Sequence, residues 1–416
     1  MFVLSDRARK LLYLTLFLAV LIGGVVAYFV ITRSAPLSPS APTQDATNPG
    51  ALPNAGQATP GTGAVPVGSL PSTGPLRLPD PTTPSLTDSL PRTSVLVDGT
   101  TRFTSLGPAR DTGDLRFYNT ADGKFYRVND LGETTPLSDK AFYGVDRVNW
   151  GSATDAAILE FPDGSNIYYD FAAQRQITLP KHWADFTFSP DDQQIVAKSL
   201  GNNESNRFLI LSNPDGSNAQ AIQELGDNAA KVHTAWSPSG DIVAYAHTGN
   251  DVGFNREQII LVGKNRENLP GLITEGRGFV PSWSPNGTSL VYSVYTSENG
   301  YLPELWVSGG TAESINSNRR RLELNTWGDK CAWHTEELLY CAVPSRLEVG
   351  AALQRDALPQ GDDQLFRINL RTGQKTNLGT IEGANAVSDL TIARDGTYAT
   401  MRNVTTGQIL RTRLSP

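Results

Sequence analysis

The side chains best suited to proton exchange with a ligand near neutral pH are the histidines, and the chain has only four. Two of them, His182 and His233, hold comparable places in the sequence. Each precedes an apolar run that ends at an aromatic residue, Phe188 in one case and Trp236 in the other. Repeated positions of this kind are candidates for a ligand site. The remaining two are His247 and His334.

Aromatic and charged side chains lie beside these histidines and at the starts of two later apolar runs. Aromatic rings next to a few polar groups suit the binding of a peptide or a glycan. The alternative is that these are ordinary loop and packing residues. The candidate ligand-face residues are His182, Trp183, Asp185, His233, Arg277, Trp327 and Asp329.

No motif with a recognisable catalytic geometry accompanies these residues. The sequence lacks Gly-x-Ser-x-Gly, His-Glu-x-x-His and the phosphate-binding Gly-x-x-x-x-Gly-Lys-Ser/Thr. The acidic residues at Asp191, Asp192 and Asp215 are too sparse for a calcium loop and fit turns instead. We therefore expect no catalytic residue, no metal and no cofactor, and a protein that is not an enzyme.

A repeated pattern must position the candidate residues. The segment Trp-Ser-Pro-Ser-Gly-Asp-Ile-Val-Ala-Tyr at 236–245 recurs as Trp-Ser-Pro-Asn-Gly-Thr-Ser-Leu-Val-Tyr at 283–292 and as Phe-Ser-Pro-Asp-Asp-Gln-Gln-Ile-Val-Ala at 188–197. Each copy reads as the aromatic end of one strand, a tight turn, and an apolar second strand. Short strands repeated every 47–48 residues indicate a propeller or a solenoid.

The repeat unit reads as a four-stranded antiparallel sheet, and no such sheet can bury both its faces alone. We therefore predict an all-β fold, a β-propeller of four-stranded antiparallel blades, with seven blades favoured and six as the alternative. A further unit at 115–128 precedes the others, and a strand near 94–97 is expected to complete the short last unit by joining the two chain ends. The strand-ending hydrophobes are Trp150, Phe188, Trp236, Trp283, Trp333 and Ile392.

The ring explains how the candidate residues could meet. In a propeller, the connections into the innermost strands lie on one face, around the central channel. The candidate ligand-face residues occupy these connections, so we expect them near one mouth of the channel.

The copies at 188–197, 236–245 and 283–292 resemble the repeats of TolB-like, WD-repeat-like β-propellers, whose usual pattern is Trp-Ser-Pro-Asp-Gly. No copy matches that pattern fully, because Phe188, Asp192, Ser239 and Asn286 each depart from it. The resemblance covers most of 115–416. It implies a propeller of the bacterial envelope that serves as a binding platform, and it also extends to uncharacterised membrane-anchored bacterial propellers.

The N-terminal region predicts a membrane anchor. Residues 1–10 are basic and read as a cytoplasmic tail, and residues 11–31 form an uncharged run long enough to span a bilayer as a helix. The alternative is a cleaved signal peptide, which usually has a shorter apolar run. Residues 32–92, rich in Pro, Ser and Thr, predict a disordered linker. Residues 93–416 would then form an extracytoplasmic propeller.

Charge and cysteine content narrow the partners and the compartment. The formal net charge is −7, and no basic face is evident, so we expect no nucleic-acid partner. Cys331 and Cys341 bracket a predicted hairpin and would face each other across its strands. Outside the cytoplasm they are expected to form a disulfide, with two buried thiols as the alternative.

Together these observations predict a single-pass membrane protein whose extracytoplasmic propeller binds or scaffolds an envelope protein or a glycan. The alternative is a propeller enzyme, such as a lyase, a cyclase or another glycan-active protein, with its site in the central funnel. An enzyme should bring titratable groups with shifted pKa values together in the channel. A binding module should instead present a broad apolar or aromatic patch.

Overall fold

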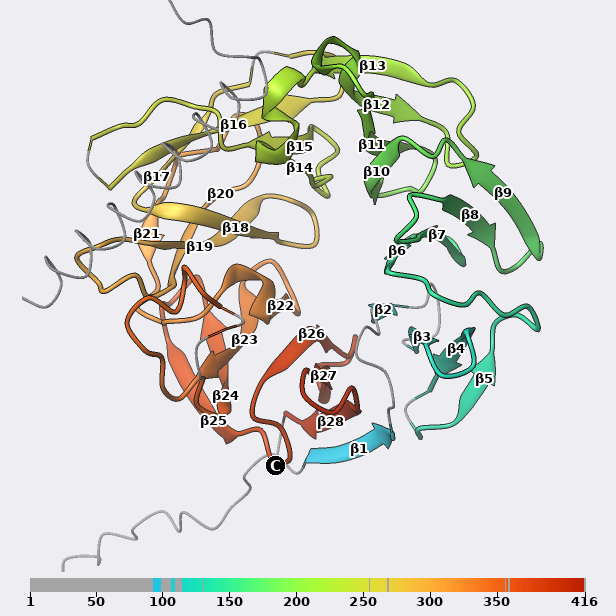
Figure 1. Cartoon of the computed structure of the whole chain (residues 1–416). Coiled ribbons are helices and arrows are strands. Elements are labelled where there is room, and N and C mark those ends of the chain that lie inside the picture. Colours follow the sequence, from blue (N-terminus) through green and yellow to red (C-terminus); the bar gives the residue numbers. More distant parts are fainter. Residues whose placement is uncertain are drawn as a thin grey trace, which may run out of the picture. The chain divides into compact units, whose positions relative to one another are not determined.

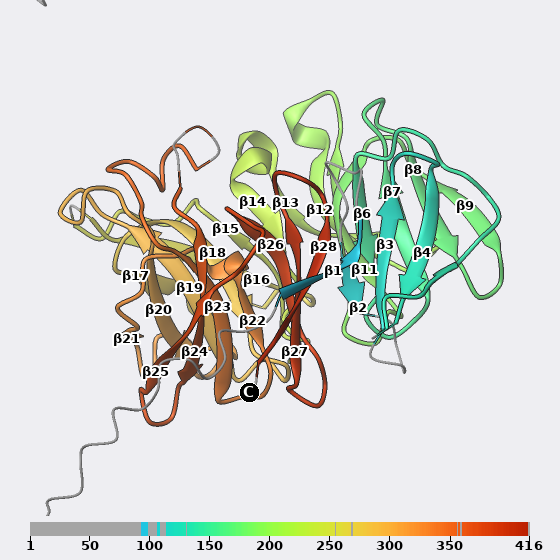
Figure 2. The same cartoon turned by 90° about the horizontal axis from the view of Figure 1, so that it is seen from below.

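The computed structural model describes residues 93–98, 106–108, 114–129, 131–253, 255–267, 269–355, 357 and 360–414. These residues form seven four-stranded antiparallel sheets and three short 3-10 helices. The sheets stand side by side around a central axis, as Figure 1 and Figure 2 show in two views. The predicted propeller is confirmed, and the favoured count of seven blades is correct.

The first four blades run in chain order from the innermost to the outermost strand. Blade 1 contains β2 (Gly107–Pro108), β3 (Leu115–Asn119), β4 (Lys124–Val128) and β5 (Thr134–Pro136). Blade 2 contains β6 (Arg147–Trp150), β7 (Ala156–Glu160), β8 (Asn166–Asp170) and β9 (Arg175–Leu179). Blade 3 contains β10 (Trp183–Phe188), β11 (Ile195–Leu200), β12 (Arg207–Ser212) and β13 (Gln220–Glu224). Blade 4 contains β14 (Val232–Thr234), β15 (Ile242–Ala246), β16 (Glu257–Gly263) and β17 (Leu272–Thr274).

The remaining blades follow the same order, except that the last takes one strand from the N-terminal side. Blade 5 contains β18 (Arg277–Trp283), β19 (Ser289–Tyr295), β20 (Glu304–Gly309) and β21 (Arg320–Arg321). Blade 6 contains β22 (Cys331–Trp333), β23 (Leu338–Pro344), β24 (Asp363–Asn369) and β25 (Lys375–Thr380). Blade 7 contains β26 (Val387–Ile392), β27 (Tyr398–Asn403), β28 (Ile409–Arg413) and β1 (Thr93–Val97). The 3-10 helices are η1 (Glu204–Asn206), η2 (Gly226–Lys231) and η3 (Gly328–Lys330).

The two ends of the propeller sequence meet in blade 7. Strand β1 lies antiparallel beside β28, where Thr93 pairs with Thr412 and Ser94 with Arg411 (Figure 1). The hydroxyl groups of Thr93 and Thr412 lie 2.8 Å apart. The prediction that residues near 94–97 complete the last blade is therefore confirmed, and this pairing covers an edge of β28 that would otherwise be exposed.

The hydrophobic core lies between neighbouring blades rather than at one centre. Between blades 3 and 4, for example, Val196 and Leu209 pack with Trp236 and Val243, and all four are buried. Because each blade is apolar on both faces, it needs a neighbour on either side. This requirement makes the ring the stable arrangement.

The repeated Ser-Pro-x-Gly segment forms the turn between the first two strands of a blade. In blade 4, the Ser237 hydroxyl accepts a hydrogen bond of 3.1 Å from the backbone of Ile242, and Gly240 has a φ of 82°. In blade 3, Asp192 takes the place of the glycine with a φ of 55°. Because Asp tolerates the left-handed region better than most residues, the turn survives the substitution.

Asp192 also stabilises the neighbouring blade. Its carboxylate accepts hydrogen bonds of 3.0, 2.8 and 2.7 Å from the backbone N–H groups of Ser152, Ala153 and Thr154, which form the first turn of blade 2. On the other side of this turn, the fully buried guanidinium of Arg116 in blade 1 donates 2.9 Å to the carbonyl of Thr154. The turn that lacks the proline is thus held by side chains of both adjacent blades.

A buried ion pair within blade 6 also contacts blade 7. Nζ of Lys330 lies 2.7 and 2.6 Å from the two carboxylate oxygens of Asp363, and the side chains are 2% and 0% exposed. Asp363 also accepts a hydrogen bond of 2.7 Å from the backbone of Val387 in β26. Burial lowers the pKa of Lys330 and raises that of Asp363, so both charges depend on their mutual contact.

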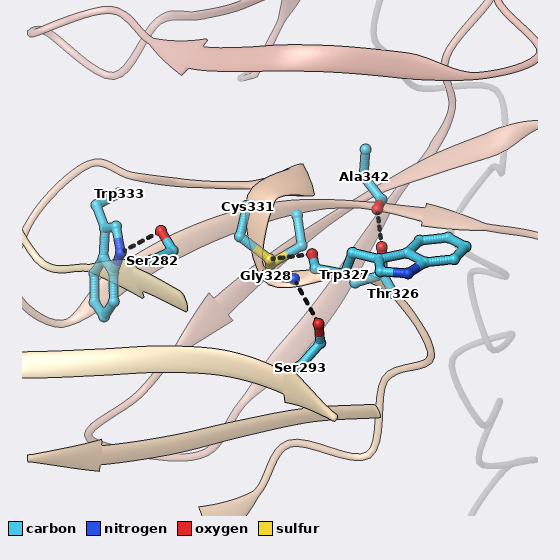
Figure 3. The surroundings of a disulfide bond; sticks show 9 residues. Ser282, Ser293, Thr326, Trp327, Gly328, Cys331, Trp333 and Ala342 are labelled. Atoms are coloured by element: carbon cyan, nitrogen blue, oxygen red, sulfur yellow. Dashed lines mark hydrogen bonds between the residues drawn. A yellow bond between two sulfur atoms is a disulfide. The ribbon is translucent and has the colours of Figure 1, made fainter. Parts of the chain in front are cut away.

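The two cysteines form the expected disulfide across blade 6. Cys331 of β22 and Cys341 of β23 are direct register partners and are bonded through their sulfur atoms. Hydrogen bonds to side chains around it connect blade 6 to blade 5. Nε1 of Trp333 donates 3.2 Å to the Ser282 hydroxyl, and the backbone N–H of Gly328 donates 3.1 Å to the Ser293 hydroxyl (Figure 3).

The predicted cytoplasmic tail (1–10), membrane helix (11–31) and linker (32–92) lie outside the described residues. Among the residues that are described, no helix combines the length and the apolar character required to cross a membrane. Membrane anchoring therefore stays a prediction.

Candidate functional site

A cavity of about 580 Å³ lies where the innermost strands of blades 2, 3 and 4 meet. Both acidic and basic side chains line it. They include Arg147 at the start of β6, Glu160 at the end of β7, Asp185 in β10, Lys198 in β11 and His233 in β14. We call this cavity, with these five residues, the funnel pocket.

Asp185 is the central residue of the funnel pocket. Its backbone has a φ of 58°, at a point where the register between β10 and β11 shifts. Its Oδ2 lies 2.9 Å from Nζ of Lys198 and accepts a 3.3 Å hydrogen bond from the backbone of Thr234. A non-glycine residue with positive φ in a strand is held by its surroundings and is often found at functional sites. Here the strained backbone and two partners fix the carboxylate.

Lys198 connects the pocket to blade 4. Besides Asp185, its ammonium group donates hydrogen bonds to the backbone carbonyls of Ala229 (3.3 Å) and Val232 (2.7 Å). Its side chain is only 11% exposed. All three ammonium protons therefore have acceptors in the protein, which makes Lys198 a positioning residue rather than a free cation.

Arg147 is a cation of the funnel pocket that remains available to a ligand. Its side chain is 57% exposed, and Nη1 lies 3.6 Å from Oδ1 of Asp185 and 3.9 Å from Oε1 of Glu160. Within the described part of the chain, no hydrogen bond from its guanidinium is present, whereas Glu160 already accepts 2.8 Å from Asn149. A guanidinium with unused donors, at the rim of a pocket, is suited to bind a carboxylate in a bidentate manner.

His233 supplies an imidazole to the same pocket. Its ring stacks on Tyr245 with centroids 5.2 Å apart, and the ring of His247 packs edge to face against it with centroids 5.7 Å apart. Burial and the nearby charge of Lys198 lower the pKa of His233 against the opposing effect of Asp185. The imidazole is therefore mainly neutral at pH 7 and offers both a donor and an acceptor nitrogen.

Tyr245 lies behind His233 and remains protonated. Burial raises the pKa of its hydroxyl to about 12, and the carboxylates of Asp185 and Asp329 add to this shift. The carboxylate of Asp329 acts on the same hydroxyl as that of Asp185, so its charge is felt next to the funnel pocket.

The structure brings some of the sequence-predicted ligand-face residues together and not others. His182, Trp183, Asp185 and His233 all line the funnel pocket. Trp183 is almost fully buried, so its ring forms part of the wall and not an exposed platform.

The other three predicted residues are not among those that line the pocket and have partners of their own. Arg277 pairs with Asp251 at 2.9 Å, and Asp329 pairs with Arg355 at 2.7 Å. Trp327 is buried, and the guanidinium of Arg355 lies 4.6 Å from the centre of its ring.

Sequence reasoning missed Arg147, Glu160 and Lys198. One signal was available: Arg147, Asp185 and His233 each stand three residues before the strand-ending aromatic of their repeat. Lys198 and Glu160 lie on second strands, and their places follow only from the strand register, in which Lys198 is opposite Ala184 and Glu160 is opposite Arg147.

No family model matches the sequence, and no curated protein matches it either. Solved structures do share the fold. An oligogalacturonate lyase in complex with manganese has a TM-score of 0.54 at 14% identity and covers 77% of this chain and 93% of its own. The Cps50 (Swd1) β-propeller domain of Myceliophteria thermophila has a TM-score of 0.52 at 13% identity, with coverage of 78% and 100%.

The chain has the β-propeller fold of these solved structures, with seven four-stranded blades. TolB from Acinetobacter baumannii is also similar, with a TM-score of 0.43 at 11% identity and coverage of 70% of this chain and 65% of its own.

The prediction that the protein is not an enzyme is wrong, because enzymes also have this fold. It depended on the lack of a recognisable catalytic motif, yet oligogalacturonate lyases share this propeller fold. A catalytic site in a propeller is assembled from residues of several blades, so a continuous sequence motif is not required.

Proposed function

We propose that this propeller binds an acidic glycan in the funnel pocket. The observation that carries the proposal is Arg147, a half-exposed guanidinium with unused donors at the rim of a cavity of about 580 Å³. A cavity of this size suits roughly one or two sugar rings. A carboxylate on one ring would bind Arg147, and ring hydroxyls would bind Glu160, His182 and His233, which supply acceptors and donors.

The mixed charge of the pocket favours a sugar over a simple anion. Glu160 and Asp185 lie close to Arg147 and would repel a small, highly charged ligand. A sugar acid carries one carboxylate and several hydroxyl groups, so it can use the guanidinium and the carboxylates at once. The fold is compatible with such a ligand, because proteins named as oligogalacturonate lyases share it.

Replacement of Arg147 tests the proposal. We expect Arg147→Ala in the full-length chain to weaken binding of an oligouronide about 10-fold, because a charge-assisted bidentate contact is lost. Binding of the matching neutral oligosaccharide should change little. Isothermal titration calorimetry would measure both affinities.

Arg371→Ala is a matched control, since Arg371 is exposed and pairs with Glu337 on blade 6. Equal affinity of Arg147→Ala and the unchanged protein for the oligouronide would contradict the assignment. Recovery of only a protein partner from solubilised envelope, without glycan binding, would support the scaffolding alternative instead.

We further propose that the predicted anchor at 11–31 holds the propeller outside the cytoplasmic membrane. The basic residues of the N-terminal tail support this orientation. Protease added to intact spheroplasts should then digest the propeller while a cytoplasmic control protein survives. Protection of the propeller until the membrane is broken would contradict the orientation.

A further inference from the structure

We propose that Asp389, in β26 of blade 7, marks a second ligand position on the channel, where its carboxylate binds the hydroxyl groups of a neutral sugar. This inference rests on the proposed function, because it takes the glycan nature of the ligand from the funnel pocket. It adds a position for an uncharged sugar.

Asp389 repeats the backbone geometry of Asp185. Each stands three residues before the hydrophobe that ends its innermost strand, Phe188 in β10 and Ile392 in β26. Both strands face the centre of the ring (Figure 1). In both, the register against the second strand shifts at the aspartate, which has a φ of 58° in blade 3 and 51° in blade 7. A bulge of this kind redirects a side chain and is common next to functional sites.

The partners of the two carboxylates are also equivalent. In each blade, a cation of the second strand is opposite the residue just before the aspartate. Nε of Arg402 lies 2.7 Å from Oδ2 of Asp389, and Nζ of Lys198 lies 2.9 Å from Oδ2 of Asp185. The two aspartate side chains are 27% and 24% exposed, so Asp389 is as accessible as the carboxylate of the funnel pocket.

One oxygen of Asp389 is left for a ligand. Its Oδ2 accepts a second hydrogen bond, of 2.8 Å, from the Ser388 hydroxyl. Within the residues that the structure describes, no hydrogen bond reaches its Oδ1. The carboxylate is therefore held through one oxygen and offers the lone pairs of the other to a donor such as a sugar hydroxyl.

The fold does not require a carboxylate in such a bulge. In blade 5, β18 has a similar register shift, and the residue with positive φ there is Gly278, at 70°. Glycine adopts this conformation without steric cost, whereas aspartate is strained in it. A partly exposed ion pair, such as that of Asp389 with Arg402, contributes little stability in return. Strain of this kind is typical of residues kept for function.

The preceding blade decides which kind of sugar fits. Beside Asp185, blade 2 provides Arg147, which is 57% exposed and stands three residues before the aromatic that ends its strand. The residue at the same place in blade 6 is Lys330, which is 2% exposed and paired with Asp363. Lys330 is therefore not available to an anion. The position in blade 7 suits the hydroxyl donors of a neutral sugar and not a carboxylate.

Isothermal titration calorimetry of the full-length chain tests this position. The probes are neutral oligosaccharides of glucose, galactose, mannose and N-acetylglucosamine, and we expect at least one to bind. Asp389→Gly should weaken that binding about 10-fold, because a charged acceptor is lost. The urea midpoint should change little, since relief of the backbone strain offsets the lost ion pair. The matched control is Asp395→Asn, on the exposed turn after β26, which should change neither quantity.

Asp389→Asn gives a second readout. Asn tolerates the left-handed region and keeps one acceptor oxygen, so this variant should weaken binding less than Asp389→Gly does. A folded Asp389→Gly variant with unchanged affinity would overturn the proposal and assign the carboxylate to the fold alone. If Asp389→Gly does not fold, unchanged affinity of Asp389→Asn would overturn it. The proposal is also wrong if no neutral oligosaccharide binds.

Arg147→Ala separates the second position from the funnel pocket. Affinity for the neutral oligosaccharide that falls in Asp389→Gly but not in Arg147→Ala would support two positions. An equal loss in both variants would place the neutral sugar in the funnel pocket, overturn the second position and leave the proposed function standing. Oligouronide binding that does not depend on Arg147 would overturn the proposed function, and the result for Asp389→Gly would still decide the second position.

Discussion

Asp363→Ala is expected to destabilise the propeller by about 3–5 kcal/mol, one of the two largest effects that the structure predicts for a single substitution. The variant leaves the ammonium of Lys330 buried at 2% exposure without its counter-charge, and it removes the acceptor for the backbone N–H of Val387. The midpoint of urea unfolding, followed by tryptophan fluorescence, would fall accordingly. Asp362→Ala, at the exposed neighbouring residue, should change the midpoint little.

The double variant Lys330→Met with Asp363→Asn separates two possible causes of this loss of stability. One is the buried charge that is left without a partner, and the other is the loss of an ion pair that itself stabilises the fold. Both charges are removed, and the Asn oxygen can still accept from Val387. Because burial disfavours both charges, we expect the double variant to recover most of the loss. A double variant as unstable as Asp363→Ala would show that the pair itself stabilises the fold, and an unchanged single variant would contradict the argument altogether.

Arg116→Met is expected to have a similar cost, about 3–5 kcal/mol, through a different mechanism. The guanidinium is fully buried, donates to the carbonyls of Gly151 and Thr154, and lies 4.9 Å from the centre of the Trp150 ring. Removal of the donors leaves buried carbonyls without partners in the first turn of blade 2. The urea midpoint of the full-length chain again measures the effect.

Two further variants test the geometry of this contact. Arg116→Lys keeps the charge but cannot reach several acceptors in one plane, so it should recover only part of the loss. Arg413→Met, at an exposed position of β28, should have little effect. Equal stability of Arg116→Met and Arg413→Met would show that the turn of blade 2 does not depend on the neighbouring blade.

The fold could be predicted because its signals are local. The turn segments at 188–197, 236–245 and 283–292 fix the repeat length, and strand alternation fixes the blade. The pairing of β1 with β28 was also foreseen, since the last repeat lacked a strand. The side chains that hold adjacent turns together, such as Arg116 and Asp192, could not be foreseen, because their partners lie 38–40 residues away in another blade.

The candidate site was predictable only in part. His182, Trp183, Asp185 and His233 share a pocket because their segments lead into adjacent blades. Arg277 and Asp329 belong to later blades and meet other charged partners, which the sequence does not reveal. The exclusion of catalysis failed for a related reason: a site assembled from separate blades leaves no continuous motif to find.

The four histidines provide the most direct test of the claim that an acidic sugar binds in the funnel pocket. Two of them, His182 and His233, line the pocket, whereas His334 lies on a distant turn. Histidine-selective NMR of the full-length chain, titrated with an oligouronide, should shift the signals of His182 and His233 and leave that of His334 in place. Saturable binding that shifts neither His182 nor His233 would contradict the account.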